Sequence, residues 1–342
     1  MKTLQQTYRL GRAPELLGDF WFNSEPLSVH QLQGQPILLF FWDYTLQQSL
    51  KLIPFMNGLH SLYVEYGLVC VGVHSPEFFF EKDSANVEAT IKKNMILFPV
   101  MTDNDRLVTN AYRISSLPTL CLIDHKGEIY DLISEAIIPE RIERSVQYLL
   151  RQSGYRGELP LLLNPEFDKR YFLSDESPHQ IYTGYSHGSF GNPEGYSPEL
   201  PAEYVDPKIY FESKFYAHGI WCAERNAFRY EGNPNEGYLI CQSDEENVTI
   251  VAGSKTKASV KVELDDAPIQ ISIMGNDMQK EKKGTTYFTV DDPRLISVLQ
   301  NNRRISHSVK FIPSASGVTF YMFAFDSKQT KNSEPSTSIR NN

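Results

Sequence analysis

The sequence has few cysteines, no long apolar run and no histidine motif. None of its four cysteines lies in a Cys-x-x-Cys pair, and four are too few for a disulfide framework in 342 residues. The longest apolar runs, such as Ile37–Trp42, are six residues long, far short of a membrane span. The eight histidines form no His-x-His or HExxH pattern. We therefore expect no disulfide scaffold, no membrane span, no metal and no cofactor.

Basic clusters are absent as well. The formal net charge is -9, and the first 155 residues carry 13 basic and 17 acidic side chains, so the acidity extends over both halves. This distribution argues against nucleic acid and against an anionic membrane surface as partners. The first ten residues, MKTLQQTYRL, lack the apolar segment of a secretory signal. A cytoplasmic protein is the expectation, although a chain whose leader had been removed would look the same.

Strand-like and helix-like segments alternate over residues 1–155. Continuous apolar runs are typical of buried central strands, and apolar residues at helical spacing indicate amphipathic helices. In chain order, the predicted segments are a strand at 36–42, a helix at 46–66, a strand at 68–74, a helix at 84–94 with Ser84 as its N-cap, a hairpin turning at Lys126-Gly127 and a helix from Pro139. This order predicts an α/β domain with helices on both faces of one sheet.

The composition changes after Tyr155. Residues 156–207 are rich in Pro, Gly and Tyr and are too aromatic for a disordered linker, so we expect an ordered connection. From 208 to 326, short alternating segments recur with turn signals between them, which predicts an all-β sandwich of the jelly-roll kind. The polar residues 327–342 are expected to form a disordered tail.

The N-terminal half resembles the thioredoxin superfamily, in its redoxin or TlpA-like branch. The phrases that carry the resemblance are LFFWDYTLQQSLKLIPFM, SSLPTLCLID and DHKGEIY. Two further phrases, FWDYT and GVHSPEFFFEKDSANVE, bring it closer to the soluble tails of DipZ-type proteins. In that subgroup a thioredoxin-like domain precedes a β-sandwich that is similar to carbohydrate-binding modules. The resemblance covers about residues 13–326 and implies this two-domain layout here.

The redox positions of that family are changed in this chain. Its pattern, D-F-W-x-Y-x-C-x-x-C, places the two cysteines on Leu46 and Ser49 and the buried aspartate on Phe40. The first cysteine attacks as a thiolate and the second resolves the mixed disulfide, chemistry that leucine and serine do not perform. Phenylalanine likewise accepts no proton. The segment Leu46-Gln47-Gln48-Ser49 therefore predicts a degenerate site without thioredoxin-type activity.

Pro118, in SSLPTL, falls where the family has a cis-proline facing the active-site turn. In the family, the backbone beside this proline pairs with an extended substrate peptide. One interpretation is that a peptide groove survives without its chemistry, and the other is that the cis bond only shapes the start of the hairpin. The candidate binding residues are Trp42, Tyr44, Leu46, Ser49, Leu117 and Pro118.

The four cysteines and His74 are the remaining candidates for residues that carry site chemistry. The strand with Phe40 is expected between those with Cys70 and Cys121, so the two backbones lie ~9.6 Å apart, beyond the ~7 Å that a disulfide allows. We interpret both as core residues. Cys222 and Cys241 could neighbour each other across strands. His74 ends a strand near the presumed site with Glu77 close by, and we interpret it as a hydrogen-bonded loop histidine.

Aromatic side chains in the β-rich half could stack on sugars, although alternate strand positions must be buried. They are Tyr210, Phe211, Tyr216, Trp221, Phe228, Tyr230 and Tyr238. We predict a redox-inactive thioredoxin-like binding or scaffold module for a protein or peptide partner. The alternatives are a thiol-disulfide oxidoreductase or peroxide-handling enzyme that uses a non-standard cysteine, and a carbohydrate-binding protein.

Overall fold

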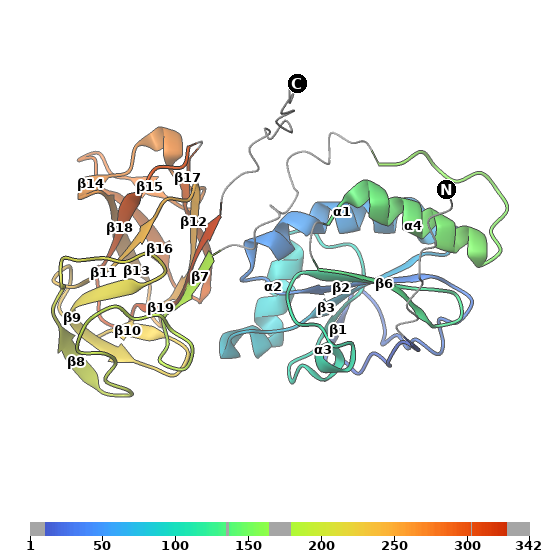
Figure 1. Ribbon diagram of the computed structural model, residues 1–342, viewed down its shortest axis with the longest axis horizontal. Helices are drawn as coiled ribbons and strands as arrows, with labels where there is room; N and C mark the ends of the chain where they lie inside the picture. The colour runs from blue at the N-terminus through green and yellow to red at the C-terminus, as the bar shows by residue number, and fades with distance from the viewer. Residues whose placement is uncertain (1–10, 135–136, 164–178, 302, 327–342) are drawn as a thin grey trace, which may run out of the picture. The chain divides into compact units, whose positions relative to one another are not determined.

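The computed structural model describes residues 11–134, 137–163, 179–301 and 303–326 (Figure 1). The chain divides into two compact units, Met1–Asp175 and Glu176–Asn342. The expected tail at 327–342 lies outside the described residues.

The N-terminal unit is built on a six-stranded sheet with the order β1-β4-β3-β2-β5-β6. Its strands are β1 (Trp21–Phe22), β2 (Ile37–Trp42), β3 (Val69–His74), β4 (Val100–Thr102), β5 (Thr119–Ile123) and β6 (Ile129–Ile133). All six residues of β2 are buried, as their uninterrupted apolar sequence predicts. β2 runs parallel to β3 and antiparallel to β5, so the strand with Phe40 lies between those with Cys70 and Cys121, as expected.

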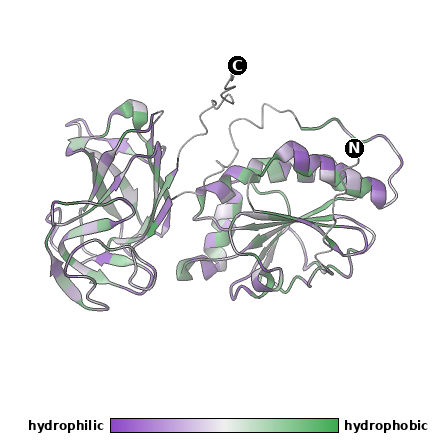
Figure 2. Ribbon diagram, in the orientation of Figure 1, coloured by the Kyte–Doolittle hydropathy of each residue, from purple (hydrophilic) through white to green (hydrophobic). Residues whose placement is uncertain are grey.

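Helices cover both faces of this sheet, which confirms the predicted α/β arrangement (Figure 1). The helical segments are α1 (Gln47–Tyr63), η1 (Val64–Tyr66), η2 (Phe79–Lys82), α2 (Ser84–Lys93), α3 (Leu107–Ala111) and α4 (Pro139–Gln152). Residues of α1, α2 and α4 form one core cluster with the sheet, and residues of α3 pack on the other face. Figure 2 shows hydrophobic colour along the central strands and both colours along α1 and α4, the pattern of amphipathic helices.

The helix cap expected at Ser84 is wrong by one residue. Asp83 is the N-cap, because its backbone is extended and its carboxylate accepts the Ala85 N–H at 2.9 Å. Ser84 is the first helical residue. Both residue types are good caps, and the backbone geometry that decides between them is not visible in the sequence. The hairpin of β5 and β6 and the start of α4 at Pro139 agree with the predicted positions.

The C-terminal unit is an antiparallel all-β structure, as predicted. Its strands are β7 (His179–Tyr182), β8 (Pro201–Tyr204), β9 (Phe215–Ala223), β10 (Phe228–Tyr230), β11 (Tyr238–Ser243), β12 (Asn247–Gly253), β13 (Ala258–Leu264), β14 (Ala267–Pro268), β15 (Gln279–Lys280), β16 (Thr286–Val290), β17 (Arg294–Gln300), β18 (His307–Pro313) and β19 (Thr319–Asp326), with one helical turn, η3 (Ile271–Ile273). Buried residues alternate with less buried ones along β13 and β18, as in a sheet with one face on the core. The inner residues of all the longer strands form one hydrophobic cluster.

The ordered connection expected at 156–207 differs from the structure in its second part. β7 pairs with β19, and β8 pairs with β9, so residues 179–204 already belong to the β unit. Phe190 between them packs at 4.8–5.3 Å from the rings of Tyr196, Tyr204, Phe215 and Phe228. The prolines and glycines of this segment break the alternation that normally reveals strands.

Within the described residues, no helix has both the length and the apolar character needed to cross a membrane.

Candidate functional site at the end of strands β2 and β3

The turn between β2 and α1 holds the positions where the redox residues were expected. Leu46 has an extended backbone and immediately precedes the first helical residue, Gln47, so it lies at the N-terminus of α1. Ser49 is completely buried, and its Oγ accepts the Asp43 N–H at 3.3 Å. Phe40 is buried between Trp42 and Phe98. The side chains at these positions supply packing and one local hydrogen bond.

Most of the candidate binding residues are inaccessible. Trp42, Tyr44 and Pro118 are buried, whereas Leu46 and Leu117 are half-buried. The Leu117–Pro118 peptide bond is cis. Thr119 pairs with Phe41, so continuing this antiparallel register places Leu117 beside the start of the turn at Asp43. Among the described residues, the N–H and C=O of Leu117 take part in no hydrogen bond. An unpaired backbone donor and acceptor therefore lie next to the turn.

All four cysteines are free and buried. Cys70 and Cys121 belong to core clusters on opposite faces of the sheet, which confirms their interpretation as core residues. Cys241 lies opposite Phe215, seven residues before Cys222 on β9, so it is about 23 Å along the strand from Cys222 at ~3.3 Å per residue. Burial raises the pKa of each of these thiols above its ordinary value.

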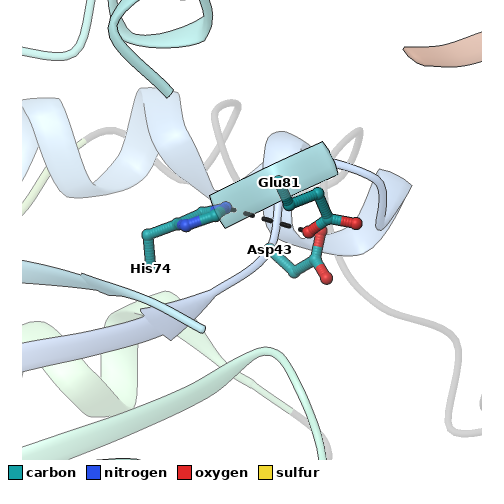
Figure 3. Close-up of side chains that lie close together, drawn as sticks. All are labelled: Asp43, His74 and Glu81. Carbon is teal, nitrogen blue, oxygen red and sulfur yellow. Dashed lines mark ion pairs between the residues drawn. The ribbon is translucent and has the colours of Figure 1, made fainter. Parts of the chain in front are cut away.

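A cluster of three ionisable side chains lies directly beneath the turn (Figure 3). Asp43 follows the last residue of β2, His74 ends β3, and Glu81 lies in η2. All three are completely buried, and one nitrogen or oxygen atom from each lies within 4.8 Å of the others. Figure 3 shows the imidazole edge of His74 directed at Glu81, with His74 Nε2 and Glu81 Oε2 3.9 Å apart. Residues distant in sequence thus converge at one edge of the sheet.

The carboxylates of the cluster are held by local hydrogen bonds. Asp43 Oδ1 accepts the Thr45 N–H at 2.6 Å and the Thr45 hydroxyl at 2.7 Å. Glu81 accepts the backbone N–H groups of Glu77 and Phe78 at 3.4 and 3.3 Å. Burial raises the pKa of Glu81 well above its usual range, and the charge of Asp43 raises it further. Burial also raises the pKa of Asp43. The hydrogen bonds that Asp43 accepts from protonated Glu81 and from Thr45 lower this pKa, but by less than burial raises it.

His74 has no hydrogen-bond partner for either ring nitrogen within the described structure. The Tyr44 ring stacks on it at 5.2 Å with an angle of 13° between planes, and Trp42 contacts it edge-on at 5.3 Å. Burial lowers the pKa of His74 to about 3, so the imidazole is neutral at physiological pH. A neutral imidazole with both nitrogens unpaired is rare in a protein interior, because buried polar groups are usually satisfied.

Comparisons with known proteins match both units. A family model described as Thioredoxin-like matches residues 34–129, and one described as Thioredoxin like C-terminal domain matches residues 178–326. The protein DipZ of Mycobacterium tuberculosis is 26% identical over 294 residues, which is 84% of this chain and 40% of DipZ. The chain belongs to the thioredoxin-like superfamily. Its two units follow the order of the DipZ-like resemblance, and the chain spans about 40% of the DipZ length.

Other relatives match the N-terminal unit. The thiol-disulfide oxidoreductase ResA of Geobacillus kaustophilus is 31% identical over 117 residues, which is 34% of this chain and 63% of ResA. The crystal structure of a thiol:disulfide interchange protein from Chlorobium tepidum is 24% identical, covers 41% of this chain and 95% of its own, and has a TM-score of 0.36. At the family level, the relatives thus include thiol-disulfide oxidoreductases. This chain has leucine and serine where the resemblance places the cysteines.

The expectation for His74 as a hydrogen-bonded loop histidine is wrong, because it is a buried strand residue whose ring makes no hydrogen bond within the described structure. Glu77, expected near it, is exposed and pairs with Arg106 at 3.5 Å. The acids that face His74 are Asp43 and Glu81, which sequence reasoning missed. The available signals were an aspartate directly after an apolar strand, and a glutamate closing the aromatic run 78–80.

The aromatic residues of the β unit separate into core and surface groups. Tyr216, Trp221, Phe228 and Tyr230 are buried at 0–1% exposure, so they have no free ring face for a sugar. Phe211 is 65% exposed. The hydroxyls of Tyr210 and Tyr238 both donate to the buried carboxylate of Asp206 (2.8 and 2.5 Å).

Proposed function

We propose that the chain is a thioredoxin-like binding module that holds an extended peptide segment beside Leu117 and performs no thiol chemistry. The observation that carries the proposal is the N-terminus of α1, where Leu46 and Ser49 replace the thiol pair. Thiol exchange needs a thiolate that reaches its substrate. Each of the four cysteines is buried and has a raised thiol pKa, so none supplies such a thiolate.

The unpaired backbone of Leu117 supports the peptide-binding part. A half-buried N–H and C=O without partners among the described residues offer one donor and one acceptor to an incoming extended chain. Extended peptides commonly bind by such main-chain hydrogen bonds, while neighbouring side chains select the sequence. The half-buried side chains of Leu46 and Leu117 would provide the apolar contacts, because Trp42, Tyr44 and Pro118 are covered.

A binding experiment tests this proposal. An array of extended peptides is probed with the wild-type protein, and the tightest binders are titrated against Leu117→Glu and Leu46→Glu. We expect a loss of affinity of tenfold or more, about 1.4 kcal/mol, because each change places a charge in the contact region. Leu107→Glu is the matched control, since Leu107 is a 60% exposed leucine on α3. If all three variants bind like wild type, peptide binding at Leu117 is excluded.

An activity assay tests the redox part. The rival function, thiol-disulfide exchange, is the one named for ResA. In insulin reduction by dithiothreitol, we expect the wild-type protein to match the uncatalysed background, because no thiol lies at the helix N-terminus. Catalysis that disappears in Cys70→Ser or Cys121→Ser would contradict this proposal and support the rival.

A further inference from the structure

Three buried side chains of the N-terminal unit form a cluster that the proposed peptide site does not use. Asp43 directly follows β2, His74 ends β3 and Glu81 lies in η2, and all three are completely buried. Their nearest ligand-type atoms lie within 4.8 Å of one another. Both ring nitrogens of His74 have no hydrogen-bond partner in the described structure, and Asp43 Oδ2 has none other than the hydrogen bond that protonated Glu81 can donate to this carboxylate. Buried polar atoms without a partner are rare in protein interiors, so this cluster fits the binding of a ligand.

We propose that Asp43, His74 and Glu81 bind a divalent transition-metal ion of the Zn²⁺ class. Imidazole nitrogen and carboxylate oxygen are both ordinary ligands of Zn²⁺, and one neutral imidazole with two carboxylates leaves the bound site without net charge. Burying two ionised carboxylates without a cation is costly, and a divalent ion that takes the place of the Glu81 proton offsets that cost.

The geometry is compatible with this ion after a small adjustment. Zn–N and Zn–O bonds of ~2.0–2.2 Å place the ligand atoms of a tetrahedral site about 3.3 Å apart. His74 Nε2 and Glu81 Oε2 are 3.9 Å apart and the three ligand atoms lie within 4.8 Å of one another, so side-chain rotations must bring these atoms closer by at most about 1.5 Å. Asp43 keeps its hydrogen bonds from Thr45 on Oδ1 and offers Oδ2, which accepts no hydrogen bond from Thr45. The Thr45 bonds would orient the ligating carboxylate.

The site would be structural. None of the three ligands is exposed, and Tyr44, which stacks on His74, is only 6% exposed. The ion would tie η2 to the ends of β2 and β3, directly beneath the turn that carries Leu46. Loading is expected to be slow because the site is closed, so the protein should be refolded in the presence of the metal. The inference does not depend on peptide binding at Leu117.

The test uses the full chain, stripped with a chelator and refolded with Zn²⁺ or Co²⁺. We expect one bound Zn²⁺ per chain after dialysis, and a Tm increase of about 5–10 °C at a free Zn²⁺ concentration 100-fold above its Kd. Glu81→Gln and His74→Gln should each weaken Zn²⁺ binding by about 100-fold or more, since each removes one ligand. His307→Ala is the matched control. It removes the surface pair in which His307 Nδ1 lies 2.6 Å from Asp265, and it should leave binding unchanged.

Circular dichroism checks that the variants fold. If they do not fold, the Co²⁺ spectrum and the X-ray absorption spectrum of the wild-type protein test the proposal instead. Both spectra should show nitrogen and oxygen ligands and no sulfur ligand. The proposal is overturned if the wild-type protein binds neither ion, if folded Glu81→Gln and His74→Gln bind like wild type, or if the absorption spectrum shows sulfur ligands.

Discussion

At the scale of single residues, the partners of a buried acid decide in which direction its pKa moves. Glu81 and Asp206 are both buried acids, but their pKa values shift in opposite directions. Burial raises the pKa of Glu81, and the neighbouring carboxylate of Asp43 raises it further. Burial alone would raise the pKa of Asp206 too, but bonds from Tyr238, the N–H and ammonium of Lys208, and Tyr210 outweigh it and hold the pKa at about 2.

A pH-dependent contribution to stability follows for Asp206. Its folded pKa lies below the unfolded value of ~3.9, so its stabilisation is present above pH 4 and is lost as the pH falls toward 2. The shift corresponds to roughly 2 kcal/mol of unfolding free energy at pH 7. Urea unfolding of Asp206→Asn should show a deficit of this size at pH 7 that shrinks by pH 2.5. Asp292→Asn, at an exposed position, is the control. A deficit that is equal at both pH values would contradict the assignment.

At the scale of elements, length and pattern decided what the sequence could predict. The six apolar residues of β2 and the amphipathic repeats of α1 and α4 are long enough to identify. The strand β1 and the helix α3 have two and five residues, too few for a period, and were not predicted. The turn positions Leu46 and Ser49 were predictable because they lie on one continuous motif. The cluster beneath them was not, since tertiary packing alone joins Asp43 to Glu81.

A redox pair introduced at the first turn of α1 tests this element. Leu46→Cys with Ser49→Cys places one thiol at the helix N-terminus, which favours its thiolate by ~0.3–1 kcal/mol, and the other in the first turn. We expect the double variant to lose two free thiols with mild oxidant. Its activity should be weak, because Phe40 accepts no proton, and higher with Phe40→Asp if that variant folds. The control is Leu46→Cys alone. A folded double variant that stays reduced would show that positions 46 and 49 do not correspond to the family's cysteines.

At the scale of the whole molecule, the chain is two units with separate cores, and the second unit begins well before its regular strands. The strand β7 adds to β19 at the sheet edge, and Tyr185, Phe190 and Tyr196 pack against the β-unit core. Removing this segment would leave residues 322–325 of β19 unpaired on one side and open the aromatic cluster around Phe215 and Phe228. The segment therefore belongs to the fold of the β unit.

Fragments with different starting points test this boundary. A fragment 176–342 contains every described strand of the β unit and should fold alone with a cooperative thermal transition. A fragment 208–342 lacks β7, β8 and the half-buried ring of Phe190. It should be less stable by several kcal/mol, since losing a fully buried phenylalanine alone costs about 3–5 kcal/mol, or should fail to fold. Phe190→Ala in the longer fragment separates the two causes, because it removes the ring and keeps both strands. Near-ultraviolet circular dichroism and urea unfolding provide the measurement. Equal stability of the two fragments would show that residues 179–204 are a connection with no role in the β fold.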